Sequence, residues 1–157
     1  MLGETTGDSS RYAEPETAVP RAATALSGVI RTTLGPNGMD KMVIGEKGTV
    51  IVTNDGSSII NWMDIDHPVG QLVKHVAVAQ YDSVGDGATT AVVLAGALLS
   101  EAAALRADGL HPTTIVDGYV QAFETAVDQV EQHELEIDTR YDDRLNDLAR
   151  TAITGRW

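Results

Sequence analysis

Apolar residues recur with helical spacing soon after a polar start to the chain. One such set, which begins after Pro20, is Ala22, Ala25, Leu26, Val29 and Ile30. Residues of this spacing share one side of a helix, so the pattern predicts an amphipathic helix that turns this side toward the core. Leu34-Gly35-Pro36 ends the pattern, because Gly and Pro interrupt a helix. A loop over Gly35 to Gly38 follows.

Two short runs of β-branched and apolar residues come next, Met42 to Ile44 and Thr49 to Thr53. Gly45-Glu46-Lys47-Gly48 separates them, and this arrangement predicts a β-hairpin. The second run leads into Asn54-Asp55-Gly56, and a short helix is expected over Ile59 to Met63.

Helical patterns fill the rest of the chain. Pro68 to Ser83 predicts a helix whose inward residues are Leu72, Val73, Val76 and Ala79. Ala88 to Arg106 is almost wholly apolar and offers no polar face before Ser100, so we expect a core helix that is buried on most sides.

The next helix opens at Pro112 and carries a regular apolar seam. Val116, Val120, Phe123, Val127 and Val130 follow one another at steps of 4, 3, 4 and 3, the spacing that packs one helix against another. Tyr141 to Ile153 is the last predicted helix. Residues 1–17 are polar without an apolar period and are predicted to be a mobile tail, so residues 18–157 form one mainly α-helical unit with a small β-hairpin.

Charge and composition exclude several classes of partner and site. Asp plus Glu number 23 against 11 Lys plus Arg, and a net charge of -12 repels phosphate backbones, so we expect no nucleic-acid partner. The dispersed acidic charge is typical of a protein that works in high salt, which screens self-repulsion. Without cysteine, neither a disulfide nor a thiolate metal site is possible. The longest purely apolar run, Ala91 to Leu99, is half a bilayer span, so we expect a cytoplasmic protein without a membrane partner.

Three glycine-containing turns carry the candidate chemistry. They are Leu34-Gly35-Pro36-Asn37-Gly38, Asn54-Asp55-Gly56 and Gly85-Asp86-Gly87-Ala88-Thr89-Thr90. Glycine lets a backbone approach a ligand, and the free amides at a helix start attract anions. The third turn fits this best, since it adds two hydroxyls and a carboxylate that can hold the Mg²⁺ accompanying phosphates.

Each turn alone also has a purely structural explanation. Asn54-Asp55-Gly56 is a common tight turn, Gly35 is an ordinary helix C-cap, and Asp86 or Thr89 can cap the next helix. The residues Gly35 to Lys41 do not fit the P-loop pattern, which disfavours a P-loop hydrolase. The four histidines lack metal-ligand spacing, so surface or capping roles are expected for them.

The residue sequences of the three turns, and their order along the chain, resemble the nucleotide-binding motifs of the chaperonins. The matching stretches are Arg31 to Met42, Val52 to Gly56 and Gly85 to Thr90, and Leu34-Gly-Pro-Asn-Gly-Met-Asp-Lys-Met42 is similar to the group II branch, which includes the archaeal thermosome. The resemblance implies part of an equatorial domain, a helical bundle that binds ATP and Mg²⁺ and contacts other chaperonin subunits in rings.

The resemblance also assigns roles to residues. Thr33, Leu34, Gly35 and Pro36 would lie along the phosphates, and Asn54 and Gly56 would touch them from the second turn. Gly87, Ala88, Thr89 and Thr90 would bind phosphate oxygens, and Asp86 would hold Mg²⁺. Asp55 would be the catalytic carboxylate that helps position water.

Departures from the family pattern limit what the resemblance implies. Ala88 replaces a hydroxyl residue, Arg156 stands where a lysine senses the γ-phosphate, and we expect the intermediate and apical domains to be absent. We therefore expect weak binding of MgATP, little hydrolysis, and unfolded-protein clients only through a complete subunit. Without the returning chain, the helices at Ala88 to Leu99 and Val116 to Val130 should expose an apolar patch. An association domain or remnant that no longer binds nucleotide is the alternative.

Overall fold

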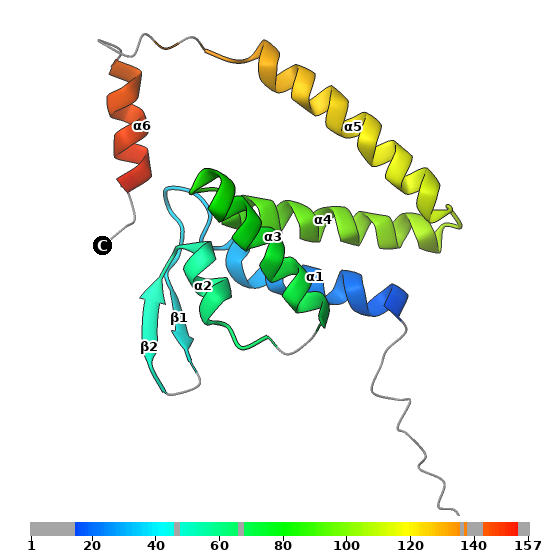
Figure 1. The fold of residues 1–157 in the computed structure, drawn as a ribbon, viewed down its shortest axis with the longest axis horizontal. Coiled ribbons are helices and arrows are strands. Elements are labelled where there is room, and N and C mark those ends of the chain that lie inside the picture. Colours follow the sequence, from blue (N-terminus) through cyan, green and yellow to red (C-terminus); the bar gives the residue numbers. More distant parts are fainter. Residues whose placement is uncertain (1–14, 46–47, 66–67, 136, 138–142, 154–157) are drawn as a thin grey trace, which may run out of the picture.

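The computed structural model describes residues 15–45, 48–65, 68–135, 137 and 143–153. These ranges hold six helices and one antiparallel hairpin (Figure 1), which confirms the expected mainly helical fold. The elements are α1 (Pro15–Arg31), β1 (Lys41–Ile44), β2 (Val50–Thr53), α2 (Gly56–Trp62), α3 (Pro68–Val84), α4 (Ala88–Ala107), α5 (Pro112–Gln132) and α6 (Asp143–Ile153).

The core lies where α1, α2, α3 and α4 meet (Figure 1). Its buried residues are Ala23, Ile30, Ile59, Ile60, Val73, Ala77, Ala88 and Val92. Small residues allow the tightest contact, because a β-carbon on Gly96 of α4 would overlap the side chain of Ser27 on α1. This close α1–α4 pair holds the loop after α1 and the start of α4 on one side of the molecule.

The sequence-based prediction for α1 needs two corrections. The helix begins at Pro15 and runs through Pro20, which has no amide hydrogen to donate. Its buried stripe is Ala23, Ser27 and Ile30, whereas Val29 is 41% exposed. Of the predicted mobile tail, residues 1–14 lie outside the described residues and residues 15–17 belong to α1.

The inward face predicted for α3 is wrong except at Val73. Its buried residues are Val69, Gly70, Val73 and Ala77, while Leu72 is 63% and Val76 is 40% exposed and Ala79 is exposed as well. The contact side of α3 thus carries small residues, because α4 and α1 pack against it closely. Leu72 and Val76 remain outside this contact.

The prediction that α4 is buried on most sides is also wrong. Ala88, Val92 and Gly96 form one buried stripe at steps of four, and Leu94 is 57% exposed. An all-apolar pattern does not indicate which side of a helix packs, and only one side of α4 is covered here. By length and composition alone α4 is also apolar enough to cross a bilayer, a test that core helices of water-soluble proteins pass too.

The seam of α5 is largely uncovered, as expected for this chain. The buried residue of α5 is Ile115, which is not part of the seam, and the five seam residues are between 37% and 71% exposed. Figure 1 shows α5 leaving the end of α4 and diverging from it.

In the hairpin, Met42 pairs with Val52 and Ile44 with Val50, which confirms the predicted strands. The last helix begins at Asp143, and Tyr141 lies outside the described residues.

Candidate functional site

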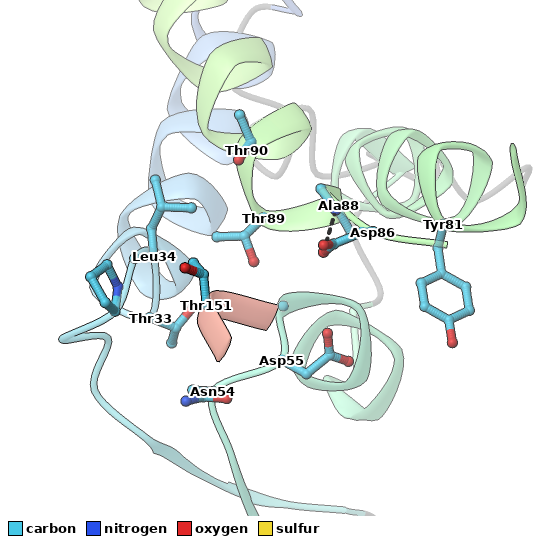
Figure 2. A pocket seen from close by; sticks show the side chains of 14 residues that line it. Thr33, Leu34, Asn54, Asp55, Tyr81, Asp86, Ala88, Thr89, Thr90 and Thr151 are labelled. Atoms are coloured by element: carbon cyan, nitrogen blue, oxygen red, sulfur yellow. Dashed lines mark hydrogen bonds between the residues drawn. The ribbon is translucent and has the colours of Figure 1, made fainter. Parts of the chain in front are cut away.

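One cavity of about 260 Å³ gathers the three glycine turns (Figure 2). Its lining contains all twelve residues singled out in the sequence, namely Thr33, Leu34, Gly35, Pro36, Asn54, Asp55, Gly56, Asp86, Gly87, Ala88, Thr89 and Thr90. The turns lie far apart in the sequence and reach the cavity from the ends of α1, β2 and α3. The structure thus places these residues together, and their roles toward a ligand stay predictions.

The first turn is a compact loop at the end of α1. The Thr33 hydroxyl donates to the Ile30 carbonyl at 2.7 Å, and the Gly38 amide donates to the Gly35 carbonyl at 3.0 Å. Gly35 has a φ of +87°, a left-handed conformation that favours glycine. A β-carbon on Gly38 would overlap the Thr33 carbonyl. Both glycines are therefore required for the path that carries residues 33–36 along the cavity.

The second turn is organised by the Asp55 carboxylate, which is the N-cap of α2. Its Oδ2 atom accepts from the Ser58 amide at 2.8 Å and from the Ser57 hydroxyl at 2.6 Å. The Asp55 amide donates to the Thr53 hydroxyl oxygen at 3.1 Å. The predicted catalytic carboxylate consequently also has a structural task, since N-cap side chains satisfy amides that the helix leaves without partners.

The third turn joins α3 to α4 through Gly85, Asp86 and Gly87. Both glycines are left-handed, with φ of +80° and +82°. The exposed Asp86 carboxylate accepts through Oδ1 from the Gly87 amide at 2.7 Å (Figure 2). Gly87 is the N-cap of α4 and supplies no side chain to the first amides of this helix. The start of α4 therefore presents amides and the two threonine hydroxyls of residues 89 and 90 at the cavity.

The second and third turns meet inside the cavity wall. Gly56, the first residue of α2, packs against the side chain of Thr89 in the first turn of α4. All three glycine turns, which follow one another along the chain, therefore converge on one cavity. The model of the TCP-1/cpn60 chaperonin family matches residues 26–157, most of the chain.

The chain belongs to the TCP-1/cpn60 chaperonin family. It is 50% identical over 135 residues to a thermosome subunit of Methanopyrus kandleri, covering 86% of this chain and 25% of that one. It is 46% identical over 136 residues to thermosome subunit 3 of Haloferax volcanii, covering 87% and 26%. These matches confirm the resemblance to thermosome-type subunits.

The fold agrees with a solved chaperonin as well. The crystal structure of a group III chaperonin in the open state superposes with a TM-score of 0.82 at 37% identity, covering 89% of this chain and 28% of that one. The chain thus spans about a quarter of the length of the chaperonins it matches.

Two cavity residues, Tyr81 and Thr151, were missed as candidates in the sequence. Tyr81 lies in the last turn of α3, where its carbonyl accepts from the Gly85 amide at 2.7 Å. Its place one turn before Gly85 was the available signal. Thr151 reaches the cavity from α6, and only the chaperonin resemblance pointed to its segment. Arg156, which stands at the family's lysine position, lies outside the described residues.

The cavity fits a magnesium ion that arrives with phosphates better than a resident metal. The described residues contain no cluster of three or more His, Cys, Asp or Glu side chains that could hold an ion. Mg²⁺ commonly uses one or two protein carboxylates together with substrate phosphates and water. Asp86 supplies one such carboxylate, and its Oδ2 atom has no hydrogen-bond partner among the described residues.

Proposed function

We propose that this chain is the ATP-binding portion of a thermosome-type chaperonin subunit, a family that carries out ATP-dependent protein folding. The supporting observation is the single cavity on which the three chaperonin motifs converge. Backbone amides at a helix start, small residues and hydroxyls suit an anionic phosphate chain. A nearby carboxylate suits the cation that accompanies it.

Each turn supplies a distinct part of this proposed site. The loop of Thr33 to Pro36 borders the phosphates on one side, and Asn54 with Gly56 borders them on the other. Gly87, Ala88, Thr89 and Thr90 bind phosphate oxygens at the start of α4, and Asp86 holds Mg²⁺. The ion neutralises phosphate charge when it is bound. Ala88 offers its amide alone, so binding is weaker than a hydroxyl residue at this position would give.

Asp55 is the proposed carboxylate that places the attacking water. Its Oδ2 atom is bound to the start of α2, so the carboxylate has a fixed orientation at the cavity wall. Phosphoryl transfer depends on such placement more than on covalent chemistry. In the chaperonins that this chain resembles, the intermediate domain supplies a second carboxylate for the attacking water, and that domain lies outside these residues. The isolated chain therefore binds MgATP but turns it over very slowly.

The proposed partners are other chaperonin subunits, with unfolded proteins bound only by a complete subunit. A second candidate function is an association domain that has lost nucleotide binding, for which the exposed seam of α5 would supply the contact surface. Thermal unfolding with and without MgATP separates the two. A ligand at 100 times its dissociation constant adds about 2.7 kcal/mol of stability, whereas an association domain gains none from nucleotide.

A further inference from the structure

The Asp86 turn is braced by one side chain from α3, that of Gln80. The Gln80 Nε2 atom donates to the Asp86 carbonyl at 3.1 Å. A β-carbon on Gly87 would have three nearest neighbours, and all three are Gln80 side-chain atoms, the first at 3.2 Å. Gln80 therefore both contacts the turn and bonds to it, although it does not line the cavity.

The Gln80 bond fixes the plane of the peptide between Asp86 and Gly87. In a trans peptide the carbonyl and the amide hydrogen point in opposite directions. With the carbonyl held toward Gln80, the Gly87 amide points the other way, where it donates to Asp86 Oδ1 at 2.7 Å. The orientation of the carboxylate is thus linked through one peptide plane to the side chain of Gln80.

Glycine makes this link necessary. A half-turn of the peptide plane changes the φ of Gly87 from its observed +82° to a negative value, and glycine occupies both signs with similar ease. The turned plane would aim a carbonyl oxygen at the Asp86 carboxylate in place of an amide. The conformational preference of Gly87 alone does not select the observed orientation, and the Gln80 bond favours it.

We propose that Gln80 is a positioning residue that holds the Asp86 carboxylate and the start of α4 in the geometry that binds a phosphate-bound divalent cation. The cation-binding part of this inference rests on the proposed function. Loss of one hydrogen bond to a neutral group corresponds to about a threefold to tenfold change in an equilibrium. Gln80 variants should therefore lose that factor in the gain in ATP affinity that Mg²⁺ provides.

The test uses two variants, Gln80→Glu and Gln80→Met, which both remove the Nε2 donor but differ in charge. The control is Gln121→Glu, on the exposed face of α5. Amide proton shifts of the labelled, nucleotide-free chain are measured first. The Gly87 resonance should move upfield in both Gln80 variants and stay in place in the control. The Gly85 amide, bonded to Tyr81, should stay in place throughout because it reports on the end of α3.

Dissociation constants for ATP with Mg²⁺ and for ATP with EDTA form the second arm. The dissociation constant with EDTA divided by that with Mg²⁺ should fall about threefold to tenfold in both Gln80 variants and not in Gln121→Glu. An unmoved Gly87 resonance, equal movement of Gly85, or an unchanged ratio would overturn the inference. If the unchanged chain binds no MgATP, the proposed function fails, and the nucleotide-free spectra still decide whether Gln80 fixes the turn.

Discussion

Gly56 packs against Thr89 so closely that a β-carbon on residue 56 would overlap the threonine hydroxyl. Gly56 begins α2 and Thr89 lies in the first turn of α4, and both line the cavity. This contact sets how near the second glycine turn lies to the third. A glycine that looks like part of an ordinary tight turn is thus required by its neighbour across the cavity wall.

Gly56→Ala should destabilise the fold by about 1–3 kcal/mol, because the added methyl group forces α2 and α4 apart. Thermal denaturation measures the change. The matched control is Gly118→Ala in α5, where an added β-carbon meets nothing within 4 Å. Alanine is the better helix former, so this control should gain up to about 1 kcal/mol. Equal effects of the two substitutions would show that the Gly56 contact is not close.

Asp55→Ala and Asp55→Asn should differ in stability, because Asp55 is the N-cap of α2. Asparagine is as good an N-cap as aspartate, whereas alanine costs about 0.5–2 kcal/mol. Urea denaturation of both variants tests this. Asparagine is therefore the proper substitution for testing the catalytic charge, since a low phosphate-release rate in Asp55→Ala could reflect partial unfolding. Equal denaturation midpoints would contradict the capping role.

Phe123→Gln should leave stability within about 0.5 kcal/mol, because the ring is 68% exposed on α5. Ile115→Ala, at the buried residue of the same helix, should cost about 2 kcal/mol or more. Sedimentation of the two variants should also differ, with less self-association after the loss of Phe123. A large loss of stability in Phe123→Gln would mean that another surface of the protein covers the seam.

The chain should gain helix content in molar KCl relative to dilute buffer. Its net charge of -12 is dispersed, and the Debye length falls to about 3 Å at 1 M salt, which screens the repulsion between carboxylates. Circular dichroism across a KCl series measures the effect, with sucrose of matched viscosity as the control. Helix loss as salt rises would refute the proposed adaptation to high salt.

The order of elements could be predicted because Gly and Pro separate the apolar patterns so clearly. Gly85 to Gly87 divides α3 from α4 and Pro112 begins α5, as the sequence indicated, whereas α1 ends at Arg31, before the predicted stop at Leu34-Gly35-Pro36. The twelve cavity residues were predictable for a related reason. They lie in motifs whose residue sequence is specific to the chaperonins, even though each turn taken alone has a structural explanation.

The contact faces could not be predicted from periodicity, since the closest helix contacts use small residues. Ala23, Ser27 and Gly96 form the α1–α4 contact, while the larger Val29 and Leu94 remain exposed. A prediction from the positions of large apolar residues therefore selects the wrong faces of these helices as contact faces. Tyr81 and Gln80 were missed because their roles depend on how the end of α3 approaches the third turn, which no local pattern indicates.

Isothermal titration of MgATP into the unchanged chain and into Asp86→Ala tests the central claim most directly. Asp82→Ala is the matched control, because Asp82 is an exposed carboxylate on α3 that does not line the cavity. The unchanged chain and Asp82→Ala should bind with the same affinity. Asp86→Ala should bind at least tenfold more weakly, a loss of about 1.4 kcal/mol, since it lacks the carboxylate that we propose holds the cation. Equal MgATP affinity in all three, or no binding by the unchanged chain, would contradict the assignment of this cavity to ATP.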